Sequence, residues 1–161
     1  MEIEIREIQK NDSVKLKEYW PSAHHQRRFE VQQRGEGKYL FAWVKDEPVG
    51  HLLLRWKGAL NEEVESHVSH IPNLEAIEVR PKWRDQGIGA RLIKRAEELI
   101  KEKGIDEVGL AVGITNHEAK KLYERLGYED WGNGTFEDTW TEIDENGNEI
   151  RNQSEINFLN K

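Results

Sequence analysis

The junction between an apolar strand pattern and an amphipathic helix pattern reads Val79-Arg80-Pro81-Lys82-Trp83-Arg84-Asp85-Gln86-Gly87-Ile88-Gly89-Ala90-Arg91-Leu92-Ile93. Residues 74–79 form the apolar run, and Pro81 ends it because proline lacks a ladder donor and keeps the preceding residue out of helical angles. Beyond the turn, apolar residues recur every three or four positions, which predicts a helix over residues 87–103 closed by Gly104. The centre of the chain is therefore a strand, a turn and a helix.

The turn itself carries the pattern R-x-x-G-x-G from Arg84 to Gly89. The two glycines remove Cβ atoms where the unpaired amide groups of a helix N-terminus lie, so the pattern is typical of an anion site, and an ordinary tight turn is the alternative. Leu92 stands where a dinucleotide fingerprint needs a third glycine, and no Gly-Lys-Ser/Thr follows. A phosphate or pyrophosphate is the ligand class that remains.

A second motif follows a strand pattern at residues 108–112 and runs from Thr115 to Tyr128. Thr115 and Glu118 have the spacing of a capping box, which would leave the Asn116 amide free to meet a ligand. The alternative is that Asn116 itself caps the helix.

Together the two motifs resemble the acyl-CoA-binding core of the GNAT superfamily of N-acetyltransferases, whose N-x-x-A-x-x-L-Y-x-x-x-G-(F/Y) pattern matches residues 116–128. The resemblance covers residues 74–128 closely and the flanks only in element order. It implies an α/β (α+β) fold with one domain over residues 1–161. The expected sheet is mixed, mostly antiparallel and seven-stranded, flanked by four helices, and splayed between strands 74–79 and 108–112 to admit acetyl-CoA.

The resemblance also assigns the donor site. Backbone amides from Gln86 to Ala90 would bind the pyrophosphate with help from Arg84, Asn116 would pair with the pantetheine arm, and an amide near Ile77 or Val79 would hold the oxyanion. The expected cofactor-binding residues are Ile77, Val79, Arg84, Asp85, Gln86, Gly87, Ile88, Gly89, Ala90, Asn116 and Tyr123.

Acetyl transfer from a thioester to an amine needs an acid and a base. An alkyl ammonium with a pKa near 10.4 must lose a proton before it attacks, and the departing CoA thiolate benefits from a proton donor. Tyr123 faces inward and matches the family's Leu-Tyr position, so the resemblance implies that Tyr123 is the acid. The alternative is that Tyr123 is a core tyrosine. We expect Glu75 to be the base, on the same strand face as Ile77 and Val79.

Other candidates for the base remain open. Strand alternation puts Glu78 on the face opposite Glu75. His51 is a reserve candidate, and a water relay is a further alternative.

The N-terminal third predicts a strand at residues 3–8, a helix ending at Trp20 and a second helix from Ser22 to Arg34. The second helix is dense in polar and aromatic side chains, and the resemblance places it at the acceptor pocket, with a basic surface helix as the alternative. These side chains are His24, His25, Arg27, Arg28 and Phe29.

Residues 39–45 and 49–57 predict a hairpin turning at Asp46-Glu47-Pro48. Residues 58–72 show no periodicity. We expect their His67 and His70 to lie on a loop surface and not in a zinc site, because the sequence offers no third ligand.

The C-terminal part is acidic, with no Lys or Arg between residues 126 and 150. Strand patterns at residues 135–143 and 154–159 meet around Asn146-Gly147, a strong hairpin signal. The acidic hairpin would attract a cationic amine or, alternatively, protect a sheet edge from aggregation.

Composition narrows the function classes. The 161 residues include no cysteine, which excludes a thiol nucleophile and a disulfide framework, and the net charge of -7 argues against nucleic-acid binding. No run approaches the ~20 apolar residues of a membrane span and no signal peptide is evident, so we expect a cytoplasmic protein without metal.

The expected partner is a small-molecule or peptide amine, and the chain is expected to be a monomer or a homodimer. A noncatalytic acyl-CoA-binding or regulatory module of the same fold is the alternative.

Overall fold

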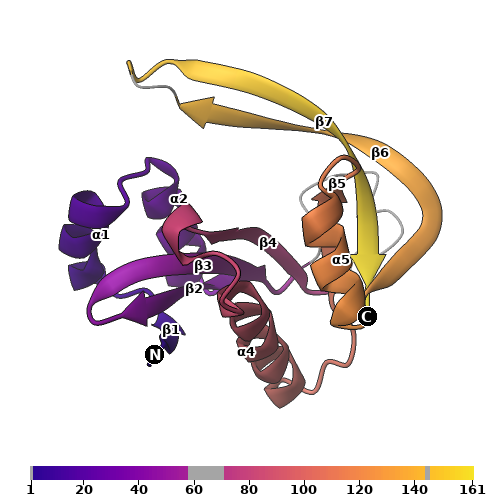
Figure 1. Cartoon of the computed structure of the whole chain (residues 1–161), viewed down its shortest axis with the longest axis horizontal. Coiled ribbons are helices and arrows are strands. Elements are labelled where there is room, and N and C mark those ends of the chain that lie inside the picture. The colour runs from indigo at the N-terminus through magenta and orange to yellow at the C-terminus, as the bar shows by residue number, and fades with distance from the viewer. Residues whose placement is uncertain (1, 58–70, 144–145) are drawn as a thin grey trace.

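The computed structural model describes residues 2–57, 71–143 and 146–161. Figure 1 shows the elements in chain order. They are β1 (Glu4–Glu7), α1 (Ser13–Tyr19), α2 (His24–Gln33), β2 (Gly37–Val44), β3 (Glu47–Arg55), β4 (Asn73–Val79), α4 (Ile88–Glu102), β5 (Gly109–Gly113), α5 (His117–Arg125), β6 (Glu129–Ile143) and β7 (Glu149–Asn160).

One sheet runs through the molecule in the order β1-β2-β3-β4-β5-β7-β6. Every neighbouring pair is antiparallel except β4 and β5, which are parallel. The predicted mixed, seven-stranded sheet with four flanking helices is confirmed for the described residues.

The helices cover opposite faces of this sheet and enclose two apolar clusters. On one face, α4 buries the stripe expected from its periodicity, and Leu92, Ile93 and Ala96 have no exposed surface. On the other face, Leu16 of α1 and Val31 of α2 pack against Tyr39 and Phe41 of β2. Each helix is held by the apolar side it turns to the sheet.

The β2–β3 hairpin turns one residue earlier than expected. Lys45 and Asp46 both have positive φ, the geometry of a tight two-residue hairpin turn. Glu47 and Pro48 belong to β3 instead, and Pro48 lies beside the register shift after Ala42.

The C-terminal hairpin is longer than its predicted strands. β6 begins at Glu129 and has a register shift between Asp130 and Thr135, where Gly132 and Gly134 adopt positive φ. Figure 1 shows the hairpin extending beyond the helices that flank the sheet. Residues 58–70, with His67 and His70, and residues 144–145 lie outside the described residues.

Candidate active site

Strands β4 and β5 separate shortly after they pair. Their register contains only Asn73 with Gly109 and Leu74 with Leu110, so the later residues of both strands lack each other as ladder partners. A cavity of about 260 Å³ occupies the opening. It is lined by Leu74, Glu75, Ala76, Ile77, Ala111, Val112, Gly113, Asn116 and Tyr123. The expected splay between these strands is therefore confirmed.

A β-bulge at Ala76 shapes the β4 side of this opening. Ala76 has φ +51°, a left-handed angle that costs an ordinary residue about 1–2 kcal/mol. The ring of His51 supports it, because its Nδ1–H donates to the Ala76 carbonyl at 2.7 Å. His51 is 1% exposed, and burial lowers its pKa to about 3, so the imidazole is neutral at pH 7.

The bulge overturns the predicted facing of the two β4 carboxylates. Glu75 pairs in register with Leu53 and Glu78 with His51, so both lie on the α1–α2 face of the sheet. Ile77 and Val79 pack on the α4 face instead. Strict alternation fails because one extra residue is inserted between Glu75 and Glu78.

Each β4 carboxylate has a cationic or ionisable neighbour. Glu75 forms an ion pair with Arg55 of β3, and its side chain is 28% exposed. Glu78 is 53% exposed, and its Oε2 lies 3.6 Å from Nε2 of His51. Arg55 had no sequence signal, because only the β3–β4 register places it beside Glu75.

The loop between β4 and α4 presents a row of amide groups. Asp85 has φ +63°, and Gly87, at the N-cap of α4, has φ +78° and ψ +11°. The first intrahelical bond runs from the Arg91 amide to the Gly87 carbonyl, and no side chain caps the helix. Within the described residues, the amides from Gln86 to Ala90 have no hydrogen-bond acceptor, which suits an anion.

The two glycines of this loop differ in role. Gly87 needs its positive φ, although a Cβ there would touch nothing within 4 Å. Gly89 lies inside the helix, where a Cβ would sit 3.7 Å from Leu122 and 3.8 Å from Val79, which are ordinary contacts. Arg84 is exposed, and its Nε donates to the Val79 carbonyl at 3.0 Å, which holds it beside the loop.

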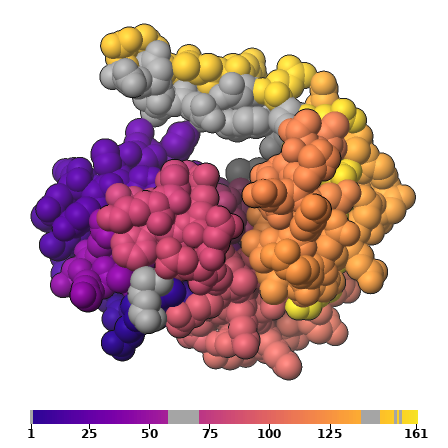
Figure 2. All heavy atoms as spheres, in the orientation of Figure 1, coloured from indigo at the N-terminus to yellow at the C-terminus, as the bar shows by residue number. Residues whose placement is uncertain are grey.

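Helix α5 forms the other wall of the opening. Asn116 is its N-cap and accepts a hydrogen bond from the Ala119 amide at 3.3 Å, so of the two alternatives capping by Asn116 is confirmed and capping by Thr115 is wrong. The Asn116 residue nevertheless lines the cavity. Figure 2 shows the segment after β4 in pink and α5 in orange on either side of a furrow in the surface.

Two tyrosines near this wall differ in their hydroxyl contacts. Tyr123 is 7% exposed and lines the cavity, and its hydroxyl makes no hydrogen bond to any described residue. Burial raises the pKa of Tyr123 to about 12, so it is protonated at pH 7. Tyr128 donates to Oε2 of Glu97 at 2.8 Å, so its hydroxyl is occupied.

The expected acceptor side chains of α2 are divided between the interior and the surface. His25 is buried and bonds Tyr39 Oη and the Trp20 carbonyl, both at 2.8 Å, while burial lowers its pKa. Arg28 donates to the same Tyr39 hydroxyl at 3.1 Å, whereas exposed Arg27 bonds to half-buried His24. Phe29 packs at the margin of the second apolar cluster.

No group of three or more His, Cys, Asp or Glu side chains in residues 2–57, 71–143 and 146–161 is arranged to bind a metal. No helix within the same ranges is long and apolar enough to cross a bilayer.

Comparison with known sequences gives one family. The model of the acetyltransferase (GNAT) family matches residues 3–128. A thialysine N-epsilon-acetyltransferase of Bos taurus is 44% identical over 57 residues, which are 35% of this chain and 34% of that protein. The chain thus matches about a third of the length of that curated relative.

Solved structures resemble the whole fold. The paia N-acetyltransferase of Thermoplasma acidophilum in complex with coenzyme A has a TM-score of 0.66 at 18% identity, covering 100% of this chain and 99% of that one. Arabidopsis thaliana Naa50 with the bisubstrate analogue CoA-Ac-MVNAL has a TM-score of 0.69 at 16% identity, with 100% and 99% coverage. At these identities the likeness concerns the fold.

Proposed function

Because the chain belongs to the acetyltransferase (GNAT) family, we propose that it transfers an acetyl group from acetyl-CoA to a primary amine by direct attack in a ternary complex. The opening between β4 and β5 carries this proposal, since its cavity is lined by a phenol and a carboxylate, and the loop that follows β4 presents a row of unpaired amides. Residues 1–161 would act as one domain.

Donor binding uses the α4 N-terminus and the separated strands. The amides from Gln86 to Ala90 bind the pyrophosphate, supported by the helix dipole, and exposed Arg84 adds charge from the rim. The arm of acetyl-CoA enters the opening, where it meets unpaired strand edges and the side-chain Nδ2 group of Asn116, whose Oδ1 caps α5. Both similar solved structures above contain coenzyme A or an analogue built on it.

The reaction begins when an amine nitrogen attacks the thioester carbonyl carbon. The carbonyl oxygen becomes an oxyanion, and a backbone N–H of β4 donates to it. Ile77 is the better of the two expected donors, because it lines the cavity and follows the bulge, whereas Val79 does not line it. Collapse of the intermediate breaks the C–S bond and yields an amide and the CoA thiolate, which takes up the second proton lost from the nitrogen and becomes the thiol.

Tyr123 assists the departing sulfur. Its hydroxyl is protonated, faces the cavity and has no competing partner among the described residues. Complete proton transfer from a phenol at about pKa 12 to a thiolate with a conjugate-acid pKa of about 8.5 would be uphill by roughly 5 kcal/mol. The phenol therefore acts chiefly as a hydrogen-bond donor to the developing thiolate.

Glu75 accepts the amine proton, directly or through water. It lines the same cavity as Tyr123, and Arg55 orients its carboxylate but competes with a substrate ammonium for it. Glu78 is the alternative, since it is more exposed and lies on the same sheet face. His51 is a poor base, because burial lowers its pKa to about 3 and leaves it only 1% exposed.

The acceptor is a small-molecule or peptide amine. The bovine relative's name specifies a thialysine N-epsilon-acetyltransferase, and the Arabidopsis complex carries a peptide in its bisubstrate analogue. Both acceptor classes present a primary amine, which is the group the proposed chemistry requires.

The test measures donor binding and amine-dependent turnover on the full chain. Acetyl-CoA at a hundred times its Kd should stabilise the fold by about 2.7 kcal/mol, and NADH at the same concentration should not. CoA release should then depend on an added amine, with a matching mass gain on one member of an amine panel. Binding without amine-dependent release would favour a noncatalytic module, and absence of acetyl-CoA binding would overturn the donor site.

A further inference from the structure

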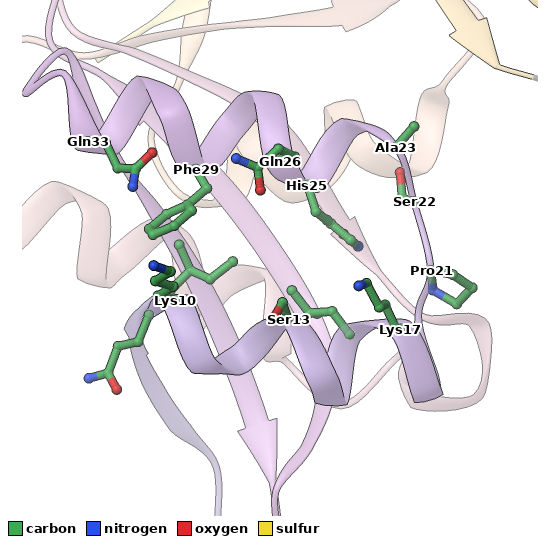
Figure 3. Close-up of a pocket in the computed structure, with 13 residues that line it drawn as sticks. Lys10, Ser13, Lys17, Pro21, Ser22, Ala23, His25, Gln26, Phe29 and Gln33 are labelled. Carbon is green, nitrogen blue, oxygen red and sulfur yellow. The ribbon is translucent and has the colours of Figure 1, made fainter.

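A second and larger hollow lies between α1 and α2, away from the β4–β5 opening. Its volume is about 570 Å³, within the roughly 300–1,000 Å³ of small-molecule sites. Figure 3 shows Phe29 and His25 projecting from α2 towards α1, while Ser13 and Lys17 project from α1 into the same space. No lining residue is shared with the cavity that contains Tyr123. The α1–α2 cleft is thus a separate site.

The walls of the α1–α2 cleft are apolar at their centre. Ile8 and Leu16 are 5% and 4% exposed and form its base, and partly buried Phe29 faces them from α2. His25 adds a ring that is uncharged, because burial lowers its pKa and both nitrogens are already bonded. This surface suits a hydrocarbon chain or an aromatic ring.

The charge of the cleft is opposite to that of the chain. Acidic residues outnumber Lys and Arg by 31 to 24 overall, yet the cleft is lined by Lys10 and Lys17 and by no Asp or Glu. Neither lysine forms an ion pair within the part of the chain that the structure describes. The adjacent carboxylate of Asp12 is already bound by Arg6 at 2.8 and 2.9 Å.

We propose that the α1–α2 cleft binds an organic anion with an apolar chain or ring. Its carboxylate or phosphate pairs with Lys10 or Lys17, and its apolar part packs against Leu16 and Phe29. An ammonium ion meets two positive charges here and no compensating carboxylate, so the cleft selects against the amine proposed for the other site. The charge of the cleft therefore excludes the ammonium group of an acceptor, and the acetyl donor is assigned to the β4–β5 opening instead.

The test is a calorimetric titration of the full chain with decanoate, used below its micelle concentration. Decanoate should bind, decylamine should bind at least tenfold more weakly, and acetyl-CoA should not displace decanoate. The K10Q/K17Q variant should weaken decanoate binding at least tenfold. The matched control is Lys15→Gln, because Lys15 is on α1 but does not line the cleft, and it should leave binding unchanged.

A charge-reversal variant distinguishes a loss of the binding site from a loss of folding. The K10E/K17E variant should reverse the preference and bind decylamine more tightly than decanoate, a gain that misfolding does not produce. Four results would overturn the proposal: no decanoate binding, equal binding of decylamine, displacement by acetyl-CoA, or equal weakening by Lys15→Gln and the double variant.

Discussion

Tyr123 and Tyr128 are both buried, and they differ in what their hydroxyls meet. Tyr123→Phe removes a donor that faces the cavity, so we expect kcat to fall about ten- to a hundredfold, the worth of one hydrogen bond to a charged atom, with the Kd of acetyl-CoA nearly kept. Steady-state kinetics and calorimetry measure the two quantities.

The control for this change is Tyr128→Phe. It breaks the bond to the Glu97 carboxylate and should cost about 1.5–3 kcal/mol of stability while leaving kcat unchanged. An unaltered kcat in Tyr123→Phe, or an equal loss in both variants, removes Tyr123 from the mechanism.

Glu75 and Glu78 can be distinguished by how the activity lost on substituting each of them depends on pH. If Glu75 is the base, Glu75→Gln should lower kcat/KM at pH 7 by about 10²–10⁴ and the deficit should shrink as pH rises, because more of the amine is already deprotonated. Glu78→Gln should retain most activity. A pH-independent loss in Glu75→Gln would instead report its broken ion pair with Arg55, and the opposite ranking would assign the base to Glu78.

One substitution at the N-terminus of α4 should raise the stability of the fold and weaken the binding of acetyl-CoA. Gly89→Ala adds a methyl with ordinary contacts inside a helix, so stability should rise by up to about 1 kcal/mol. The same methyl would point into the space between Val79 and Leu122, and we expect the Kd of acetyl-CoA to increase at least tenfold. Thermal unfolding and calorimetry check the two signs.

Gly87→Ala is the matched comparison for that helix terminus. The added Cβ atom would meet nothing within 4 Å, but the φ of +78° at this position is unfavourable for alanine. The stability of the fold should therefore fall by about 1 kcal/mol. A Gly89→Ala variant that binds acetyl-CoA normally would show that the donor does not pass over this turn.

Strand β4 depends on His51 of β3 for the bulge at Ala76. His51→Leu leaves the Ala76 carbonyl unpaired, at a cost of about 1–3 kcal/mol, and should lower kcat because the Ile77 amide is no longer aimed at the oxyanion. Adding Ala76→Gly removes the steric penalty of the positive φ, so the double variant should regain part of kcat.

This double-mutant comparison isolates the bulge from general damage. Ala76→Gly alone should leave kcat close to that of the parent chain. If Ala76→Gly restores nothing in the His51→Leu background while both variants remain folded, His51 does not act through the bulge.

At the scale of the whole molecule, buried histidines set the acid limit of stability. His51 has a pKa of about 3 in the fold and about 6.5 when unfolded, so between these values the unfolded chain binds one more proton. Stability is then fully present above pH 6.5 and is lost as pH falls towards 3, by on the order of 5 kcal/mol for this group. His25, whose pKa is also lowered, acts in the same direction.

Urea unfolding from pH 4 to 8 measures this slope. His51→Gln should flatten it, because the substituted chain no longer takes up that proton on unfolding. A slope equal to that of the parent chain would mean that His51 does not titrate on unfolding.

The local sequence pattern alone was sufficient to predict the central junction, the paired strands of the two hairpins and the buried face of α4. Pro81 ends β4, Gly87 opens α4 at positive φ, and the periodicity of residues 88–100 selects the helix face. These features follow from the backbone limits of proline and glycine and from near neighbours in the chain, so they can be read without knowing the fold.

Only the tertiary structure decided the details of the site. The bulge at Ala76 has no sequence signature, since alanine does not favour a left-handed angle, and its support comes from His51, 25 residues away. The bulge in turn placed Glu75 and Glu78 on one face, contrary to alternation. Likewise, local pattern left Thr115 and Asn116 as competing caps, and the backbone path from β5 into α5 selected Asn116. Contacts between residues distant in the chain produced the bulge and the facing of the two carboxylates, and no local pattern encodes such contacts.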